Sequence, residues 1–155
     1  MKIAVDISGK IDQKNYDSSL GFKRSDGIKG AVFLKSDTKK KILYRYKGQI
    51  TNLIEKIHCV LIFHCINEYL ENVTEIELCH DINFRRGKRL LITLFENNSI
   101  SMTKINIFPK QCSGKSDGHW PALKAFRKRK YAMKTISYEM IEKQLLNFKE
   151  SKSGR

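Results

Sequence analysis

The sequence predicts a single α/β domain in which helices flank a mixed β-sheet, and three observations support this. Short apolar runs rich in β-branched residues alternate with longer stretches of helical spacing. Gly, Ser and Asp separate these runs, as in turns. Hydrophobic residues make up 41% of the 155 positions, enough for one core. We expect residues 1–150 to form the domain and residues 151–155 to be a frayed tail.

Strands dominate the first part of the predicted order. Residues 2–8 have apolar side chains at both odd and even positions, which is typical of a strand buried on both faces. Residues 10–27 are polar and rich in turn formers, so a loop insertion is expected there. Strands are predicted at 30–34 and 42–46, and the short turn between them indicates an antiparallel hairpin.

Helices and strands alternate in the remainder. Apolar residues at helical spacing predict a long, mostly buried helix over 53–70, which begins after a Thr-Asn capping pair. Strands are then expected at 73–79 and 101–108, and helices at 85–95, from about 121, and at 137–148. The order is β-β-β-α-β-α-β-α. Crossovers place the later two of its five strands parallel to the first.

The net charge is the strongest signal in the composition. Thirty Lys and Arg against sixteen Asp and Glu give +14. Such an excess favours a polyanionic partner, most often nucleic acid, although solubility alone is an alternative. The chain has no apolar run of ~18 residues and no signal-peptide pattern. We therefore expect a cytoplasmic protein with no membrane partner and without disulfides.

Four stretches, in order, resemble the ribonuclease H-like superfamily. They are "VDISG" (5–9), "GAVFLKSDTKKKILYRYKGQITNLIE" (30–55), "IELCHD" (76–81) and "GKSDGHWPALKAF" (114–126). Within the superfamily they are similar to a small archaeal group. The resemblance covers nearly the whole chain apart from the insertion at 10–27. It implies a five-stranded mixed sheet and hydrolysis of phosphodiester bonds by a two-metal mechanism.

The resemblance also implies a set of acidic ligands. Asp6 would bridge two Mg²⁺ or Mn²⁺ ions, and Glu55 and Asp81 would complete the cluster. If the first and fourth strands are neighbours, Asp6 and Asp81 can approach each other at the sheet edge. Convergence of all three carboxylates is the geometric condition of this hypothesis.

Asp117 or His119 would complete the second metal position or assist proton transfer, by the same resemblance. The sequence departs from the family nearby. Ala122 and Leu123 stand where a helix-borne acidic residue is expected, so the catalytic set could be incomplete.

Each acidic residue also has a structural interpretation. Asp6 could be a hydrogen-bonded carboxylate of a buried strand. Glu55 could favour the helix dipole, and Asp81 could cap the next helix. Asp117 belongs to an ordinary Asp-Gly turn dipeptide.

Zinc is a weaker alternative. His and Cys adjoin each other at 58–59, 64–65 and 79–80, but the short paired spacing of zinc sites is absent. Core packing explains these residues more simply.

Basic residues gather in two segments, where they could hold phosphates. They are Arg85, Arg86, Lys88 and Arg89 in the first and Lys124, Arg127, Lys128, Arg129 and Lys130 in the second. Trp120, Phe126 and Tyr131 could stack on bases, or they could face the core.

Three functions remain open from the sequence. The first is a metal-dependent nuclease. The second is a non-catalytic nucleic-acid-binding protein on a degenerate ribonuclease H-like scaffold, and the third is a subunit whose basic faces bind an acidic protein. The kind of nucleic acid and the oligomeric state, a homodimer included, stay undetermined.

Overall fold

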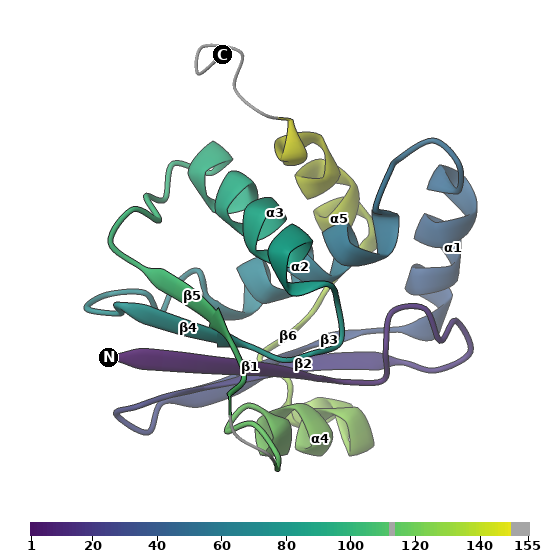
Figure 1. Ribbon diagram of the computed structural model, residues 1–155. Coiled ribbons are helices and arrows are strands. Elements are labelled where there is room, and N and C mark those ends of the chain that lie inside the picture. Colours follow the sequence, from purple (N-terminus) through teal and green to yellow (C-terminus); the bar gives the residue numbers. More distant parts are fainter. Residues whose placement is uncertain (112–113, 150–155) are drawn as a thin grey trace.

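A six-stranded mixed sheet forms the centre of the molecule in the computed structural model, which describes residues 1–111 and 114–149 (Figure 1). The strands are β1 (Lys2–Ser8), β2 (Ser18–Arg24), β3 (Lys29–Leu34), β4 (Glu75–Leu78), β5 (Asn106–Pro109) and β6 (Lys134–Thr135). Their order is β5-β4-β1-β2-β3-β6. β1, β2 and β3 are antiparallel to their neighbours in sequence, whereas β4 is parallel to β1 and β5 is parallel to β4. The predicted α/β class and mixed sheet are confirmed.

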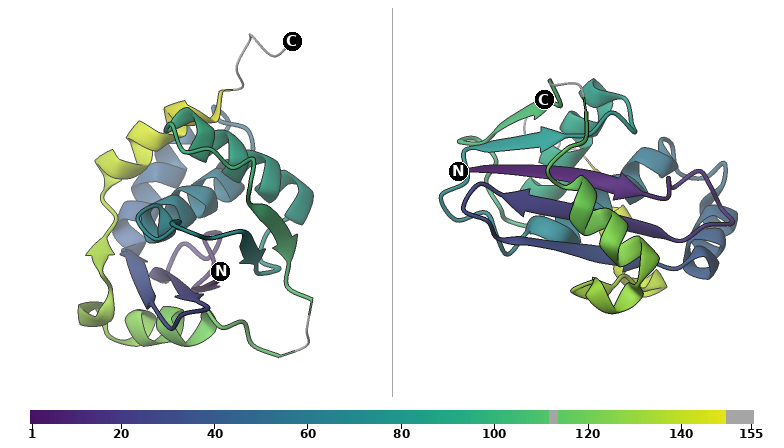
Figure 2. Two further views of the ribbon diagram at one scale, coloured as in Figure 1. Left: turned by 90° about the vertical axis from the view of Figure 1, so that its left-hand side faces the viewer. Right: turned by 90° about the horizontal axis from the view of Figure 1, so that it is seen from below.

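Helices cover both faces of the sheet. They are α1 (Ser36–Tyr46), α2 (Leu53–Ile66), α3 (Phe84–Asn97), α4 (His119–Arg127) and α5 (Tyr138–Leu145), with short 3₁₀ helices η1 (Arg129–Tyr131) and η2 (Leu146–Phe148). α1, α2, α3 and α5 lie on one face, while α4 lies across β1, β2 and β3 on the other (Figures 1 and 2). α2 is almost wholly buried between the sheet and α3, as its apolar sequence predicts.

The strand predicted at 42–46 is wrong, because these residues form the second half of α1. The side chains turned towards the core are Lys39, Ile42, Leu43 and Tyr46, which have the i, i+3, i+4, i+7 spacing of a helix. The first of the four is a lysine, so the apolar pattern alone did not reveal the helix. The sheet therefore takes its third antiparallel strand from elsewhere.

That strand is β2, which lies inside the predicted insertion at 10–27. Its sequence, SSLGFKR, carries Ser18, Ser19 and Gly21, which are typical of turns, yet all three are buried. Only residues 9–17 connect β1 to β2. The sheet also has a sixth strand, β6, of two residues, which the sequence did not predict.

Other predicted bounds differ by a few residues. The helix over 53–70 ends at Ile66, the strand at 101–108 is confined to 106–109, and the helix predicted from about 121 begins at His119. The tail at 151–155 lies outside the described residues. None of the helices in 1–111 and 114–149 has the length and apolar composition needed to span a membrane.

One fully buried lysine holds the β1–β2 connection in place. The Lys39 ammonium donates hydrogen bonds to the carbonyl oxygens of Lys10, Gln13 and Tyr16, at 3.1, 3.1 and 2.7 Å. Burial lowers the pKa of Lys39 to about 8, and the carboxylate of Asp17 opposes this shift. Lys39 is therefore still charged at neutral pH, with its three donors satisfied.

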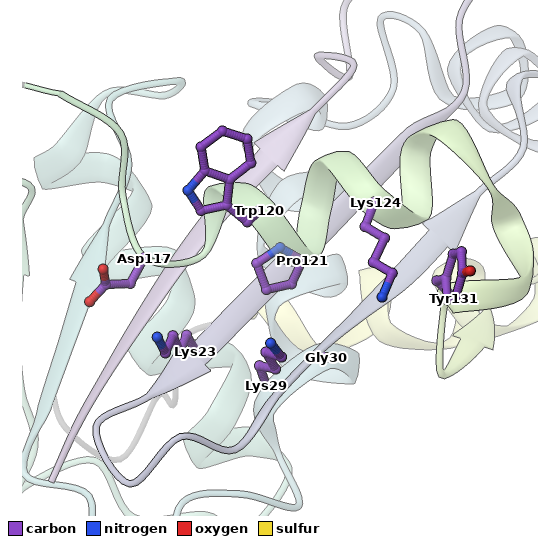
Figure 3. A pocket seen from close by; sticks show the side chains of 8 residues that line it. All are labelled: Lys23, Lys29, Gly30, Asp117, Trp120, Pro121, Lys124 and Tyr131. Carbon is purple, nitrogen blue, oxygen red and sulfur yellow. The ribbon is translucent and has the colours of Figure 1, made fainter.

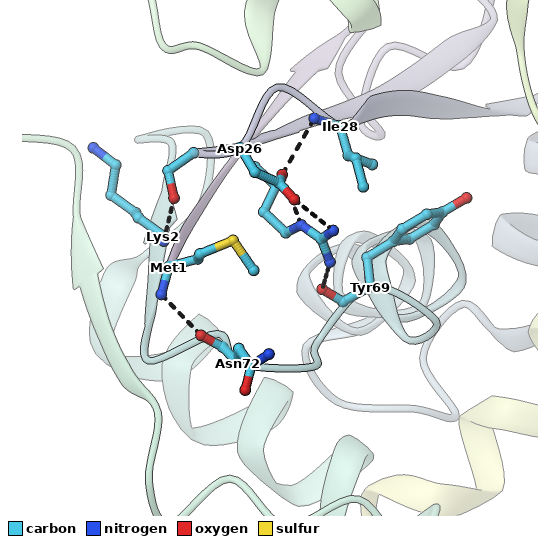
Figure 4. A network of polar contacts seen from close by, with 8 residues as sticks. Met1, Lys2, Asp26, Ile28, Tyr69 and Asn72 are labelled. Atoms are coloured by element: carbon cyan, nitrogen blue, oxygen red, sulfur yellow. Dashed lines mark hydrogen bonds and ion pairs between the residues drawn. The ribbon is translucent and has the colours of Figure 1, made fainter.

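A second polar network fixes the start of the chain (Figure 4). The Met1 amino group donates to the Asn72 carbonyl oxygen at 2.8 Å, which ties β1 to the segment before β4. The Arg24 guanidinium binds both oxygens of Asp26 and donates to the Tyr69 carbonyl oxygen. The Met1 contact thus ties the start of β1 to the segment before β4, and the Arg24 contact with Tyr69 ties the end of β2 to the segment after α2.

Candidate metal site

Two carboxylates and a thiol meet where β4 ends beside β1. β1 pairs with β4 in parallel, with Ala4 opposite Glu77, and continuing this register by two residues places Asp6 beside Cys79. One oxygen of Asp6, the Cys79 sulfur and one oxygen of Asp81 all lie within 4.8 Å of one another. The structure thus brings together Asp6 and Asp81, two of the three acidic residues expected to converge.

The Asp6 carboxylate is only partly compensated. Its side chain is 15% exposed, and burial raises its pKa above the ordinary value for aspartate. The Ile7 backbone N–H donates to Oδ1 at 2.8 Å and opposes the shift, whereas the negative charge of Asp81 adds to it. A cation between the two carboxylates would relieve both the burial and the repulsion.

The donor set is two carboxylates and a thiol. Burial raises the pKa of the Cys79 thiol, and the charges of Asp81 and Asp6 raise it further. Carboxylate oxygens suit hard cations such as Mg²⁺ or Mn²⁺, whereas a thiol that loses its proton on binding suits softer ones such as zinc. Within the described residues no other group of three His, Cys, Asp or Glu side chains comes this close, so the His-Cys pairs at 58–59 and 64–65 do not build a zinc site.

His119, at the start of α4, approaches the same carboxylate. Its Nδ1 lies 3.5 Å from Asp6 Oδ2, and its Nε2 is buried with no hydrogen-bond partner in the described chain. His119 is the first residue of α4 and its ring stands edge-on to Trp120. Three segments distant in sequence therefore meet at Asp6.

Close backbone contact sets the position of His119. A Cβ on Gly118 would lie 2.8 Å from the Asp6 backbone nitrogen and 2.8 Å from the Gly21 carbonyl oxygen. A Cβ on Gly21 would in turn lie 2.3 Å from the backbone nitrogen of Ala122. The absence of side chains at both positions lets the start of α4 rest directly on β1 and β2.

Glu55 does not join the acidic group. It lies in the first turn of α2, where it forms an ion pair with Arg86 at 3.2 Å. The expected convergence of three carboxylates is therefore met by two, Asp6 and Asp81.

Asp117 is also outside the metal group. It is exposed and lines a cavity beside α4, together with Trp120 and Lys124 (Figure 3). Of the two residues expected to complete the site, His119 is thus the one that contacts Asp6.

The two basic segments lie on opposite faces of the sheet. Arg85, Arg86, Lys88 and Arg89 belong to the first turns of α3, whereas Lys124, Arg127, Lys128, Arg129 and Lys130 belong to α4, η1 and the residue between them. Arg86 is engaged by Glu55, and the Arg129 guanidinium donates to the Thr135 hydroxyl at 3.1 Å. The site residues expected from the sequence did not include Cys79 or the exposed lysines of β2 and β3. The position of Cys79 directly after β4 was the sequence signal that could have identified it.

Comparison with known proteins gives no relative from which a role can be transferred: no family model, curated protein or solved structure matches the chain.

Proposed function

We propose that the protein is a metal-dependent nuclease on a ribonuclease H-like scaffold. The observation that carries the proposal is the meeting of Asp6, Asp81 and His119, which come from the middle of β1, the segment after β4 and the start of α4. Three antiparallel strands followed by parallel strands beside β1 agree with the resemblance of the sequence. A raised carboxylate pKa with specific charged neighbours is common at functional sites.

The side chains have separate roles in this proposal. Asp6 and Asp81 would hold the cation, and Cys79 would lie beside it as the third member of the group. A bound Mg²⁺ or Mn²⁺ would supply Lewis-acid stabilisation of the phosphate and activation of a water molecule. His119 places its Nδ1 3.5 Å from Asp6 Oδ2, where it can orient that carboxylate.

The proposal is for one cation. Of the described residues only Asp6 and Asp81 contribute carboxylates to the group, whereas the two-metal mechanism of the resemblance needs more. The third expected carboxylate, Glu55, is engaged by Arg86 in a partly exposed ion pair worth only about 0–1 kcal/mol.

Cleavage assays test the proposal. Labelled single strands, duplex DNA, RNA–DNA hybrid and a four-way junction are incubated with Mg²⁺ or Mn²⁺, using wild type, Asp6→Asn and the control Asp37→Asn. Asp37 is exposed in the first turn of α1. This helix follows β3, which β1 and β2 separate from β4 in the sheet. We expect metal-dependent cleavage that Asp6→Asn abolishes and Asp37→Asn retains. Cleavage that survives Asp6→Asn in a folded protein would contradict the proposal.

A second candidate is a nucleic-acid-binding protein without catalysis. The ion pair between Glu55 and Arg86 favours it, because this pair removes one expected ligand from the site. Salt-sensitive binding of nucleic acid without cleavage of any of the four substrates would establish this alternative.

A further inference from the structure

The strongest feature outside the metal site is a basic, aromatic groove beside α4. A cavity of about 330 Å³ opens between α4 and strands β2 and β3 (Figure 3). The lining residues that matter here are Lys23, Lys29, Trp120, Pro121, Lys124 and Tyr131. A second hollow, of about 360 Å³, shares Trp120, Lys124 and Tyr131 and continues along α4 to Arg127 and Lys128. We refer to the two hollows together as the α4 groove.

The aromatic rings of the groove are not part of the core. Trp120 is 60% exposed and Tyr131 is 44% exposed. Lysine ammonium groups lie over both rings, that of Lys115 at 4.7 Å from Trp120 and that of Lys124 at 4.2 Å from Tyr131. Large aromatic side chains left exposed among cations are typical of binding surfaces.

The charge of the groove selects an anionic partner. Lys23, Lys29 and Lys124 line the first hollow, and among its described lining residues Asp117 alone is acidic. Arg127 and Lys128 extend the positive surface through the second hollow, where none of the described lining residues is acidic. Flat rings surrounded by cations can stack on nucleobases while the cations contact phosphates.

We propose that the α4 groove binds a single-stranded segment of nucleic acid. Its bases stack on Trp120 and Tyr131, and its phosphates contact Lys23, Lys29 and Lys124. A single strand is required because bases in a duplex are already stacked on each other. The inference builds on the proposed function and names the form of its substrate. Trp120 adjoins His119, so a strand in the groove leads to Asp6.

Intrinsic fluorescence provides a direct test, because Trp120 is the protein's only tryptophan. Asp6→Asn in EDTA is titrated with oligothymidylate, with a blunt duplex of equal length, and with heparin as an anion without bases. We expect saturable quenching by oligothymidylate and little by the other two. Equal quenching by heparin or by the duplex would overturn the proposal, as would absence of quenching.

Paired substitutions locate the contact. Binding is measured by anisotropy of a labelled oligothymidylate. Tyr131→Ala and Lys29→Glu should each weaken it about tenfold. Tyr44→Ala is the matched control, because Tyr44 is 89% exposed but lies on α1, on the opposite face. Equal effects of Tyr44→Ala and Tyr131→Ala would contradict the assignment.

The two proposals fail in different ways. If oligothymidylate quenches the fluorescence and Tyr131→Ala loses this response, but wild type cleaves no substrate, the groove proposal stands and the nuclease proposal fails. If wild type shows metal-dependent cleavage and both groove variants bind with unchanged affinity, the nuclease proposal stands and the groove proposal fails.

Discussion

Lys39 and Asp6 are both charged side chains taken largely out of water, and they are held in opposite ways. Lys39 is fully buried, and three carbonyl oxygens accept its three donors. Asp6 has one backbone donor on Oδ1, a second carboxylate within 4.8 Å and a raised pKa. The hydrogen-bond donors of Lys39 are therefore satisfied by the protein alone, whereas the charge of Asp6 is only partly compensated by it.

This difference separates a structural charge from a candidate functional one. Satisfying every donor lets Lys39 act as an internal link that fixes residues 9–17. Leaving two carboxylates close together costs stability that only a proton or a cation recovers.

Replacing Lys39 should be the most damaging change. Lys39→Met removes the donor for three carbonyl oxygens and should lower the free energy of unfolding by about 3 kcal/mol. Urea denaturation measures this, with Lys40→Met, at an exposed neighbour, as the control. A Lys39→Met variant as stable as the control would mean that the link is dispensable.

Divalent cations should stabilise the wild type. Mg²⁺ or Mn²⁺ at ten times its dissociation constant contributes about 1.4 kcal/mol. For a chain of this size that raises Tm by about 3 to 6 °C. Asp6→Asn should show no such shift and Asp37→Asn the full one. An equal shift in all three proteins would point to a cation bound elsewhere.

Without metal, Asp6→Asn should stabilise the fold at neutral pH. The pKa of Asp6 is raised in the folded state, so the folded protein binds the extra proton and wild-type stability falls as pH rises through that raised pKa. The asparagine has no such charge to bury. Denaturation in EDTA across pH 3 to 8 should give curves that separate as pH rises from the ordinary aspartate pKa through the raised one and run parallel above it. Curves that are parallel over the whole range would contradict the assigned cause.

The smallest effect should follow removal of the partner of Glu55. Arg86→Ala breaks a partly exposed ion pair and should cost no more than about 0.5 kcal/mol. If Glu55 can serve the metal site, the released carboxylate should tighten Mn²⁺ binding, measured by calorimetry. Glu55→Gln is the matched variant, and an unchanged affinity in both would leave Glu55 without a role there.

The elements predicted well are those whose apolar pattern is complete. β1 and α2 are mostly buried and mostly apolar, and α3 has an apolar stripe at helical spacing. The prediction failed for α1 because Lys39 occupies a core position, so the four residues that face the core did not form an apolar pattern. β2 failed because Gly21 serves a close contact with α4, which only the folded chain reveals.

The candidate site was predicted in part, for a similar reason. Asp6 and Asp81 follow from two neighbouring parallel strands, which the order of elements implies. Their contact with Cys79 and the diversion of Glu55 to Arg86 depend on side-chain geometry that spacing does not contain. Core packing was one expectation for Trp120 and Tyr131, yet both are exposed.

The two glycines between α4 and the sheet have a consequence for how the chain can vary. Any side chain at position 21 or 118 would force α4 away from β1 and carry His119 with it. In a library that randomises each position in turn, clones selected for a folded core would accept many residues at position 6. The same selection should return glycine almost alone at 21 and 118. A position that serves only the proposed chemistry would then be distinguished from positions that serve the packing of α4, because the first would vary and the others would not.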